Sequence, residues 1–558
     1  MSIEAPTSVR ARDLDPAISA LEALYAQALK NVHQQVSKDG RVSSGLLNKH
    51  QLAAHGLAYL ATELEAARQI VAWAERVASA GEAELERSIA GAYVGELCRH
   101  LVGGVELGPC ESIALAELGL EASDVAATLL SPEVRAVSER YASGEALCRL
   151  ARVAAEKRSF GSWALGDETL EAVQTEFRRF VSQEVEPIAQ DIHRKDVLIP
   201  LELIDKMAEL GVFGLTIPEA YGGQGLDKVA MCVVTEELSR GYIGAGSLGT
   251  RAEIAAELIL GGGTEEQKQY WLPKLASGEV LPTAVFTEPN HGSDLASLKT
   301  KAEKTDDGGY LVSGSKTWIT HATRADLMTL LVRTDPDDAG YAGLSMLLAA
   351  KSRGSETNPE TEGFPDEGIT GTEIKVLGYR GMKEFEIGFD NFKVQSGALL
   401  GGAEGQGFKQ LMATFESARI QTAARGVGVA QSALEQGLKY AQERVQFGKP
   451  IFEFPRVQRK LGRMVARIMA SRQLCFFAAR AKDGGARCDL EAGMAKLLGT
   501  RAAWESADAC VQIHGGNGYA EEYVASRILV DARVLSIFEG ANEIQAHVVA
   551  RRLLEQVN

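Results

Sequence analysis

Near its C-terminal end the chain reads Ser536-Ile537-Phe538-Glu539-Gly540-Ala541-Asn542-Glu543-Ile544-Gln545. Glu539 follows an apolar run. A carboxylate among apolar groups is poorly solvated, so its pKa rises and it becomes a better base. Gly540 has no side chain and would let another molecule approach the backbone. The alternative is that Glu539 is an acid in the first turn of the helix predicted over residues 542–554, where the helix dipole favours it.

Composition limits the classes of protein to which the chain can belong. Its 558 residues are enough for two to four structural units, and the net charge of −16 argues against nucleic acid or an anionic membrane as partner. No apolar run approaches the roughly 20 residues of a membrane span. The start, from Met1 to Pro6, lacks the pattern of a signal peptide. An odd number of cysteines without a CxxC pair favours reduced thiols in the cytoplasm, and scattered histidines predict no metal site.

The periodicity predicts an α+β fold that is mostly helical. An extra N-terminal helical domain of four to six helices is expected over 1–160, and a second helical domain over 167–280. From 281 to 400 the pattern alternates, which predicts a small antiparallel barrel with a polar loop over 352–368. Its expected strands are 283–287, 309–313, 316–320, 327–333, 344–349, 369–376 and 385–392. A C-terminal helical domain over 401–558 completes the chain, with helices expected over 408–443, 455–481, 489–512, 521–531 and 542–555.

Three further stretches carry polar groups in patterns that suit a bound cofactor. The first, Phe286-Thr287-Glu288-Pro289-Asn290-His291-Gly292-Ser293-Asp294, is a strand entering a tight loop. The second, Lys316-Thr317-Trp318-Ile319-Thr320-His321, places an aromatic ring and a hydroxyl on one strand face. In the third, Val511-Gln512-Ile513-His514-Gly515-Gly516-Asn517-Gly518-Tyr519, a helix ends in glycines whose N–H groups could bind a phosphate. The alternatives are a hairpin turn, a core tryptophan and a helix C-cap, respectively.

Together these motifs resemble those of the acyl-CoA dehydrogenase family over about residues 167–558. The set is TEP-x-x-GSD, K-x-WIT, R-x-QFG (residues 444–448), Q-x-x-GG and FEG. The resemblance implies a helical domain, a middle β-barrel and a C-terminal four-helix domain. It also implies FAD as cofactor, an acyl-CoA substrate, electron-transferring flavoprotein as acceptor and at least a homodimer.

The resemblance also implies roles for individual residues. Glu539 would remove the α-proton, and its backbone N–H, with an FAD hydroxyl, would bind the thioester carbonyl. The β-hydrogen would leave as hydride to flavin N5. The residues expected to bind FAD are Phe286, Thr287, Ser293, Trp318, Thr320, Arg444, Gln446, Phe447, Gln512, Gly515, Gly516, Ala541 and Glu543. Those expected to bind the acyl-CoA are Ser293, Glu416, Arg419, Gly540 and Arg251.

Some positions depart from the family pattern. His321 stands where Asn is common, Glu384 where Thr often lies, and Pro455 where Gln is usual. Ala541 and Glu543 replace the Thr and Gln that often contact FAD. These departures put individual cofactor contacts in doubt.

The predicted substrate is a short branched dicarboxylic acyl-CoA, and the expected reaction is (2S)-methylsuccinyl-CoA to mesaconyl-CoA. The extra N-terminal domain resembles the layout of enzymes that act on this substrate, whereas Asn290 in the TEP loop looks closer to glutaryl-CoA dehydrogenases than to fatty acyl-CoA ones. Arg251 would hold the second carboxylate; alternatively, it is an exposed helix start. Other readings are a glutaryl-CoA or short branched-chain acyl-CoA dehydrogenase, an acyl-CoA oxidase, and a silent acyl-CoA-binding scaffold.

Overall fold

The computed structural model describes residues 11–356 and 362–557. The start from Met1 to Pro6 and part of the predicted loop over 352–368 therefore lie outside the described residues. The chain divides into two compact units, Met1–Ala172 with Thr422–Asn558, and Val173–Gln421. The first is called unit 1 below and the second unit 2.

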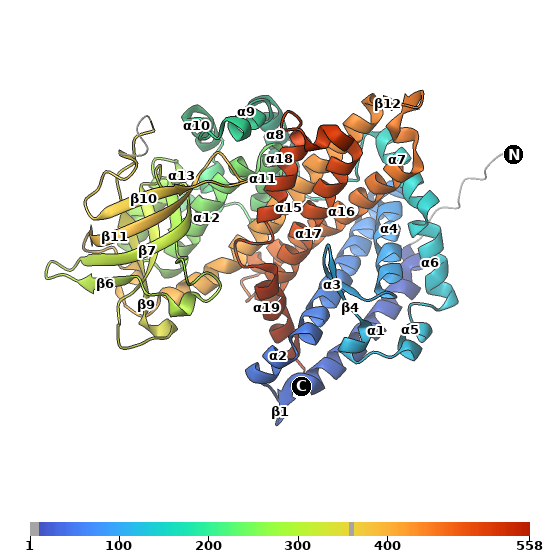
Figure 1. The fold of residues 1–558 in the computed structure, drawn as a ribbon, viewed down its shortest axis with the longest axis horizontal. Coiled ribbons are helices and arrows are strands. Elements are labelled where there is room, and N and C mark those ends of the chain that lie inside the picture. The colour runs from blue at the N-terminus through green and yellow to red at the C-terminus, as the bar shows by residue number, and fades with distance from the viewer. Residues whose placement is uncertain (1–10, 357–361, 558) are drawn as a thin grey trace. The chain divides into compact units, whose positions relative to one another are not determined.

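Unit 1 combines the N-terminal helices with the C-terminal helical bundle. Its N-terminal elements are α1 (Asp15–Val36), β1 (Ser37–Lys38), β2 (Arg41–Val42), α2 (Ser44–Lys49), α3 (Gln51–Ala80), α4 (Glu84–Leu101), β3 (Val105–Gly108), β4 (Glu111–Ile113), α5 (Ala122–Ala127), α6 (Pro132–Ala142) and α7 (Gly144–Lys157). Its C-terminal elements are α15 (Gly407–Glu443, which begins in unit 2), β12 (Val445–Gln446), β13 (Lys449–Pro450), α16 (Pro455–Asp483), α17 (Asp489–His514), α18 (Val524–Val534) and α19 (Asn542–Glu555). Helix α3 packs against both α16 and α19 (Figure 1).

A buried charge network joins the two halves of unit 1. Glu63 of α3 lies 3.4 Å from Arg467 of α16 and 3.2 Å from Arg501 of α17, and it accepts a 2.5 Å hydrogen bond from the Tyr93 hydroxyl. Burial alone would raise the pKa of Glu63, but the two guanidinium groups hold it below its usual value. Removing one partner of such a buried pair is strongly destabilising, so this network fixes α3 against α16 and α17.

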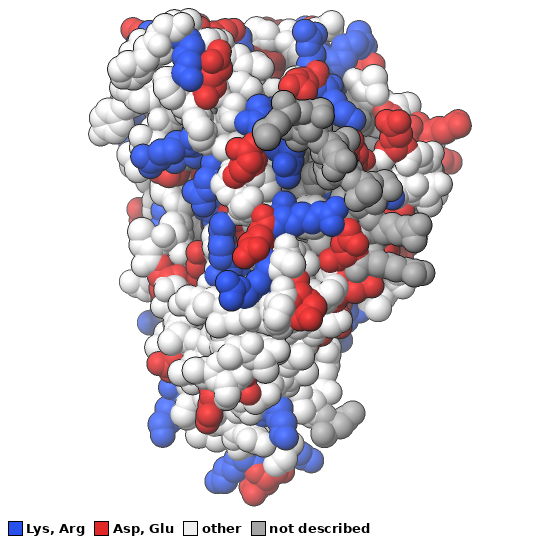
Figure 2. All heavy atoms as spheres, turned by 90° about the vertical axis from the view of Figure 1, so that its right-hand side faces the viewer, with Lys and Arg blue, Asp and Glu red and all other residues white. Residues whose placement is uncertain are grey.

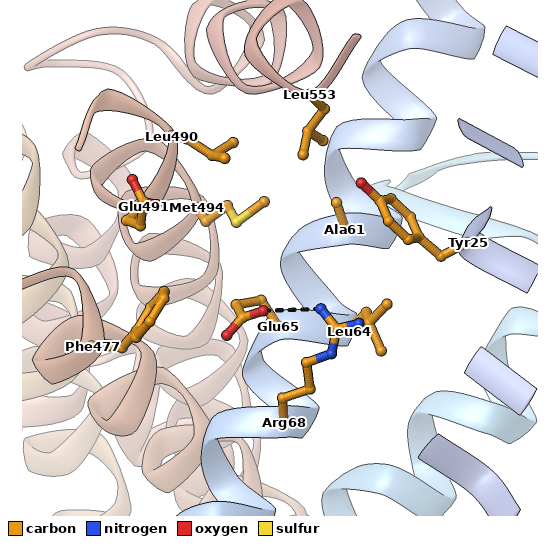
Figure 3. Close-up of a pocket in the computed structure, with 10 residues that line it drawn as sticks. All are labelled: Tyr25, Ala61, Leu64, Glu65, Arg68, Phe477, Leu490, Glu491, Met494 and Leu553. Carbon is orange, nitrogen blue, oxygen red and sulfur yellow. Dashed lines mark hydrogen bonds and ion pairs between the residues drawn. The ribbon is translucent and has the colours of Figure 1, made fainter. Parts of the chain in front are cut away.

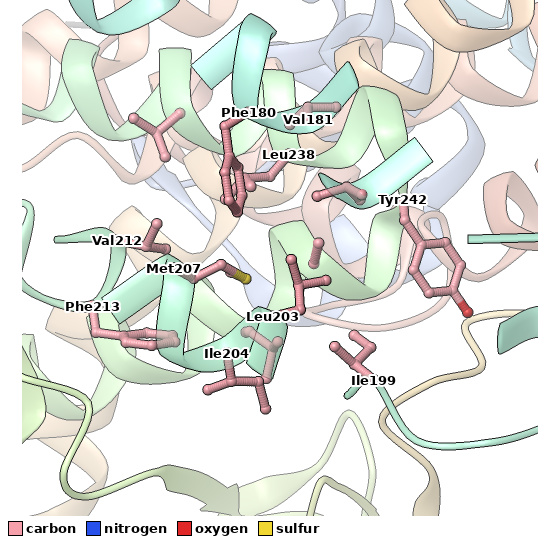
Figure 4. Packing of buried hydrophobic residues seen from close by; sticks show 14 of the residues in the cluster. Phe180, Val181, Ile199, Leu203, Ile204, Met207, Val212, Phe213, Leu238 and Tyr242 are labelled. Atoms are coloured by element: carbon pink, nitrogen blue, oxygen red, sulfur yellow. The ribbon is translucent and has the colours of Figure 1, made fainter. Parts of the chain in front are cut away.

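Unit 2 begins with a series of helices, most of which pack around one apolar core. They are α8 (Glu168–Phe180, which starts in unit 1), a π-helical turn (Val181–Val185), α9 (Glu186–Lys195), α10 (Leu201–Glu209), α11 (Lys228–Gly241), α12 (Ile243–Gly262) and α13 (Glu265–Ala276). Figure 4 shows Phe180, Leu203, Met207, Phe213 and Leu238 meeting in this core. Helix α12 starts earlier than the sequence predicts and is buried along most of its length.

Within the described residues, seven strands of unit 2 form one mixed sheet. They are β5 (Pro282–Val285), β6 (Lys301–Lys304), β7 (Tyr310–Thr320), β8 (Leu327–Arg333), β9 (Leu344–Ala350), β10 (Ile369–Ile374) and β11 (Glu384–Val394). The order is β10-β11-β7-β6-β8-β5, with β9 also paired to β8. The expectation of a purely antiparallel unit is wrong, because β5 and β6 both run parallel to β8.

Two strand predictions also need correction. The sequence analysis missed β6 and split β7 at Gly314. The strand runs through Gly314 at a φ of +146°, where a Cβ would lie 2.8 Å from the Cα of Thr300. A glycine inside a strand therefore marks close approach of a neighbouring strand here, not a turn.

Three features of the described residues bear on possible partners: the charge of the surface, the length of apolar helices and the grouping of metal-binding side chains. On the face drawn in Figure 2, Lys and Arg side chains lie among Asp and Glu side chains. In the described residues no helix combines the length and the apolar character needed to cross a membrane. The same residues contain no group of three His, Cys, Asp or Glu side chains able to hold a metal ion.

Candidate active site

Strand β7 of unit 2 presents a flat, open aromatic surface. Trp318 is 57% exposed and has a φ of +59°, so the reading of it as a core residue is wrong. Thr320 is buried, and its hydroxyl donates a 3.0 Å hydrogen bond to the Glu384 carboxylate on β11. The departure at Glu384 thus supplies an acceptor for the Thr320 hydroxyl.

The TEP loop is a tight turn placed beside β7. Glu288 and His291 exchange backbone hydrogen bonds of 3.1 Å, so the hairpin-turn reading holds for this segment. Ser293 is exposed, whereas Phe286 is buried with its ring 6.3 Å from that of Phe415. The carbonyl of Thr287 accepts from the N–H of Thr317 at 2.9 Å. The loop and the strand that carries Trp318 are therefore joined through the backbone.

A buried ion pair makes a second link between these two motifs. Lys316 is fully buried, and its Nζ donates to the Phe286 carbonyl at 2.9 Å and lies 3.3 Å from Glu288 Oε1. Glu288 also accepts from the N–H groups of Lys299 and Thr300. Burial lowers the pKa of Lys316 to about 8 although Glu288 opposes this. Burial alone would raise the pKa of Glu288, but Lys316 and these hydrogen bonds hold it below its usual value.

His321 ends this strand in a cationic setting. It is buried with a φ of +65°, and among the described residues neither ring nitrogen has a hydrogen-bond partner. Burial lowers its pKa to about 3, and Arg324, Arg353 and Arg251 add to that effect. The imidazole is therefore neutral at physiological pH.

The predicted acyl-CoA contacts of unit 2 lie on two helices. Arg251 is 8% exposed in the middle of α12, so the reading of it as an exposed helix start is wrong. Glu416 and Arg419 lie buried on α15, with the Arg419 guanidinium 5.7 Å from the Phe415 ring centre. The Ser417 hydroxyl donates to Glu257 of α12 at 2.6 Å, which ties the two helices together.

In unit 1, the predicted FAD contacts are mainly exposed. Arg444, Gln446 and Phe447 lie on and beside the β12–β13 hairpin, with Phe447 93% exposed. Gln512, Gly515 and Gly516 are exposed where α17 ends. The N–H of Gly515 donates to the Val511 carbonyl, so this glycine is a helix C-cap. A Cβ at Gly515 or Gly516 would meet nothing within 4 Å, which leaves the backbone open to a ligand.

Glu539 lies in the loop between α18 and α19. Its φ is +53°, and α19 starts only at Asn542, so the reading of Glu539 as a first-turn helix acid is wrong. Gly540 follows with a φ of +89°, and a Cβ there would lie 2.1 Å from Gln545 Nε2. The positive φ favours glycine here, and the space that its missing side chain leaves is taken by the end of the Gln545 side chain. Ala541 is partly exposed and Glu543 is exposed on α19.

Arg425 of α15 is a candidate that the sequence analysis missed. It is fully buried, and its Nη2 lies 3.6 Å from Glu539 Oε1 and donates to the Thr422 hydroxyl at 2.8 Å. The guanidinium also lies over the Phe538 ring, 4.8 Å from its centre. An opposite charge stabilises the ionised carboxylate, which works against the desolvation expected from the apolar run. The available signal was a cation three residues after Thr422 and four before Val429, inside an apolar stripe of helical spacing.

The cavity shown in Figure 3 lies in unit 1 and is lined by other residues than the predicted site. It measures about 190 Å³ and lies between α1 and α3 on one side and α16, α17 and α19 on the other. Arg68 at its edge is paired with Glu65 and Glu22 at 3.2 and 2.9 Å. None of the predicted site residues lines it.

The exposed groups fit a flavin dinucleotide. Trp318 offers a ring face, Thr287 is a partly exposed hydroxyl residue, and the open glycine backbone at 515–516 suits a phosphate. Arg444 and Gln446 present a cation and an amide on an exposed hairpin. Each unit therefore carries groups of the kinds that FAD requires.

Comparison with known proteins identifies the family. The models of the acyl-CoA dehydrogenase N-terminal, middle and C-terminal domains match residues 167–279, 283–392 and 405–554. The chain is 55% identical over 546 residues to (2S)-methylsuccinyl-CoA dehydrogenase of Cereibacter sphaeroides, covering 97% of both chains.

Two solved structures extend the comparison. A glutaryl-CoA dehydrogenase in complex with glutaryl-CoA is 34% identical with a TM-score of 0.64, covering 69% of this chain and 94% of that one. Butyryl-CoA dehydrogenase from Megasphaera elsdenii is 32% identical with a TM-score of 0.65, covering 70% and 98%. The chain therefore belongs to the acyl-CoA dehydrogenase family, whose members are FAD-dependent oxidoreductases.

Proposed function

We propose that the chain oxidises a short branched dicarboxylic acyl-CoA, (2S)-methylsuccinyl-CoA to mesaconyl-CoA. The similarity over 97% of the chain, which includes the extra N-terminal helices, supports this substrate. The observation that carries the proposal is the buried Arg425 guanidinium 3.6 Å from the Glu539 carboxylate. A cation next to the proposed base suits a substrate whose second carboxylate lies close to the α- and β-carbons that react.

In the proposed reaction Glu539 takes the α-proton, and its backbone N–H donates to the thioester oxygen. That hydrogen bond stabilises the negative charge that develops as the proton leaves. Bound FAD supplies the acceptor for the β-hydrogen, which departs as hydride. Unit 2 would hold it through Trp318, Thr287 and Thr320. The groups of unit 1 would reach the FAD of a neighbouring subunit, and they are Arg444, Gln446, Gln512 and the glycines at 515–516.

The position of the second carboxylate decides where a cation is needed. In (2S)-methylsuccinyl-CoA the methyl group is on the α-carbon and the carboxylate on the β-carbon, so this charge lies close to the base. Two like charges 4 Å apart repel by about 4 kcal/mol at an effective dielectric constant of about 20. A guanidinium that contacts Glu539 offsets this repulsion and can also bind the substrate carboxylate. Arg251 of α12 is a second candidate cation, as the sequence predicts.

An anaerobic absorbance experiment tests the substrate. Purified holoprotein is mixed with (2S)-methylsuccinyl-CoA or with 2-methylbutyryl-CoA, which has a methyl group in place of the carboxylate, and the flavin band near 450 nm is followed. Prompt bleaching by the first and slow bleaching by the second is the expected result. Fast bleaching by 2-methylbutyryl-CoA or by glutaryl-CoA alone would retain the family and reject this substrate.

The remaining assignments rest on the family resemblance. Electron-transferring flavoprotein is the proposed acceptor, a homodimer is the proposed assembly, and the cytoplasm the proposed location. Rapid reoxidation of the bleached protein by air alone would instead support the acyl-CoA oxidase reading.

A further inference from the structure

A buried lysine of α17 donates hydrogen bonds to the loop that carries Glu539. Lys496 of α17 is fully buried, and its Nζ donates to the Gly540 carbonyl at 2.6 Å and to Asn542 Oδ1 at 3.1 Å. Thr500, one turn along the same helix, also reaches Asn542 Oδ1 at 3.4 Å. The acceptors thus belong to the residue that follows Glu539 and to the first residue of α19.

The loop needs such a fastening because its backbone is unusual. Glu539 and Gly540 both have positive φ, at +53° and +89°. A non-glycine residue keeps such a conformation only when the surrounding structure imposes it. The N–H of Asn542 donates to the Ser536 carbonyl at 3.2 Å, which closes the loop on itself. Lys496 links the backbone of the loop to α17, whereas Arg425 of α15 contacts the side chains of Glu539 and Phe538.

A buried ammonium group is an expensive way to make this link. Removing a charged group from water costs free energy, whereas burying an apolar side chain is favourable. A methionine at 496 would keep an unbranched side chain but would have no hydrogen-bond donor. What only the lysine supplies is a directed, charge-assisted hydrogen bond to one peptide group.

We propose that Lys496 is a positioning residue for the dehydrogenation: it holds the Gly540 peptide so that Glu539 keeps the backbone geometry from which it reaches the α-proton. The inference rests on the proposed role of Glu539 as the base. It does not depend on which acyl-CoA is the substrate. A displacement of about 1 Å at a reacting group costs on the order of 100-fold in rate.

The test is Lys496→Met, measured by anaerobic stopped-flow bleaching of the flavin with (2S)-methylsuccinyl-CoA, unlabelled and deuterated at the α-carbon. If that compound does not bleach the wild type, the acyl-CoA that does is used instead. The expected result is full bleaching amplitude, a rate constant lower by on the order of 100-fold, and a larger α-deuterium isotope effect. Lys439→Met, at an exposed position on α15, is the matched control and should match the wild type in all three quantities.

The three readouts separate positioning from folding. A lower amplitude with an unchanged rate constant and isotope effect would mean that Lys496 only supports folding, and would overturn the proposal. An unchanged rate constant at full amplitude would overturn it too. Asn542→Ala provides a second variant with Lys496 intact, and should slow bleaching by about tenfold, or 1.4 kcal/mol, with a raised isotope effect.

Glu539→Gln is measured in parallel. If it bleaches at the wild-type rate, then the assignment of the base fails. If it is inactive while Lys496→Met is normal, then only the positioning role fails.

Discussion

Each unit of the molecule has a buried lysine that supports residues proposed for the reaction, and the two lysines have different kinds of partner. In unit 2, Lys316 lies next to the Glu288 carboxylate, and the pair joins two motifs that are also connected through the β7 backbone. In unit 1, Lys496 donates to a peptide carbonyl and an amide oxygen, and fastens a loop with two successive positive φ angles. The first supports a strand that is paired along most of its length, and the second supports a loop without strand pairing.

This difference separates two parts of the molecule. One is the segment over residues 316–321 with the TEP loop, called the wall below, which is proposed to bind the cofactor. The other is the loop of Glu539, which is proposed to do the chemistry. Trp318 has a positive φ and lies at a register shift of the β7–β11 ladder, which pairs the residues on either side of it, Lys316 and Ile319. Glu539 has no such ladder, so its position depends on a few side chains. Changes in the wall should therefore affect stability and FAD retention, whereas changes behind the loop should affect rate.

The largest expected effect is that of Glu539→Gln. Loss of a general base lowers the rate by roughly 10²–10⁴-fold. The amide is nearly isosteric and the loop is unchanged, so FAD content, read from the ratio of flavin to protein absorbance, should equal that of the wild type. A variant that retains more than half the wild-type turnover would remove Glu539 from the mechanism.

The Lys316–Glu288 pair tests the wall. Lys316→Met or Glu288→Gln alone leaves a buried group without its partner, and we expect a loss of roughly 3–5 kcal/mol in stability with release of FAD. The double variant should recover much of that loss, because neither charge is then left unpaired. Thermal melting with flavin fluorescence measures both quantities. Additive losses in the double variant would show that the two residues act independently.

The two candidate cations for the second carboxylate sharpen the comparison, because one lies in each unit. Arg425→Met and Arg251→Met should lower kcat/KM for (2S)-methylsuccinyl-CoA by roughly 10–100-fold, the effect of losing a charge-assisted hydrogen bond of about 1.5–3 kcal/mol. Activity with 2-methylbutyryl-CoA should change little. Equal losses with both substrates would reject a carboxylate-binding role for the residue in question.

How much could be predicted from the sequence follows the same division. Regular elements were predicted well: β8, α19 and most of α15 to α17 lie where apolar periodicity places them. The motifs also predicted Trp318 and Glu539 as site residues, because aromatic, hydroxyl and acidic residues stand out in a strand or an apolar run, and these roles stay predictions. The K-x-WIT motif includes Lys316, but it did not predict the ion pair of this lysine, because its partner Glu288 lies in another segment.

Two of the contacts that were missed join segments that are distant in the chain, and the third joins a loop to the helix that follows it. Arg425 meets Glu539, Lys496 meets Gly540, and Gln545 fills the space beside Gly540. A buried cation within an apolar helical stripe indicates that a partner exists, but periodicity cannot say which one. Gly540 shows the limit of reading one residue alone, because the space that its missing side chain leaves is taken by Gln545.

The smallest expected effect concerns His321, the residue that directly follows β7. Its pKa is lowered to about 3 by burial and by Arg324, Arg353 and Arg251, against about 6.5 in the unfolded chain. Between these values the unfolded state binds more protons than the folded state, so stability is lost as the pH falls below about 6.5. At pH 5 this amounts to about 2 kcal/mol. His321→Asn has no titrating group and tolerates the positive φ of this position, so its thermal midpoint should match the wild type at pH 7.5 and exceed it at pH 5. Equal acid sensitivity of the two proteins would place the acid-labile contact elsewhere, and the charge network around Glu63 in unit 1 would be the next to test.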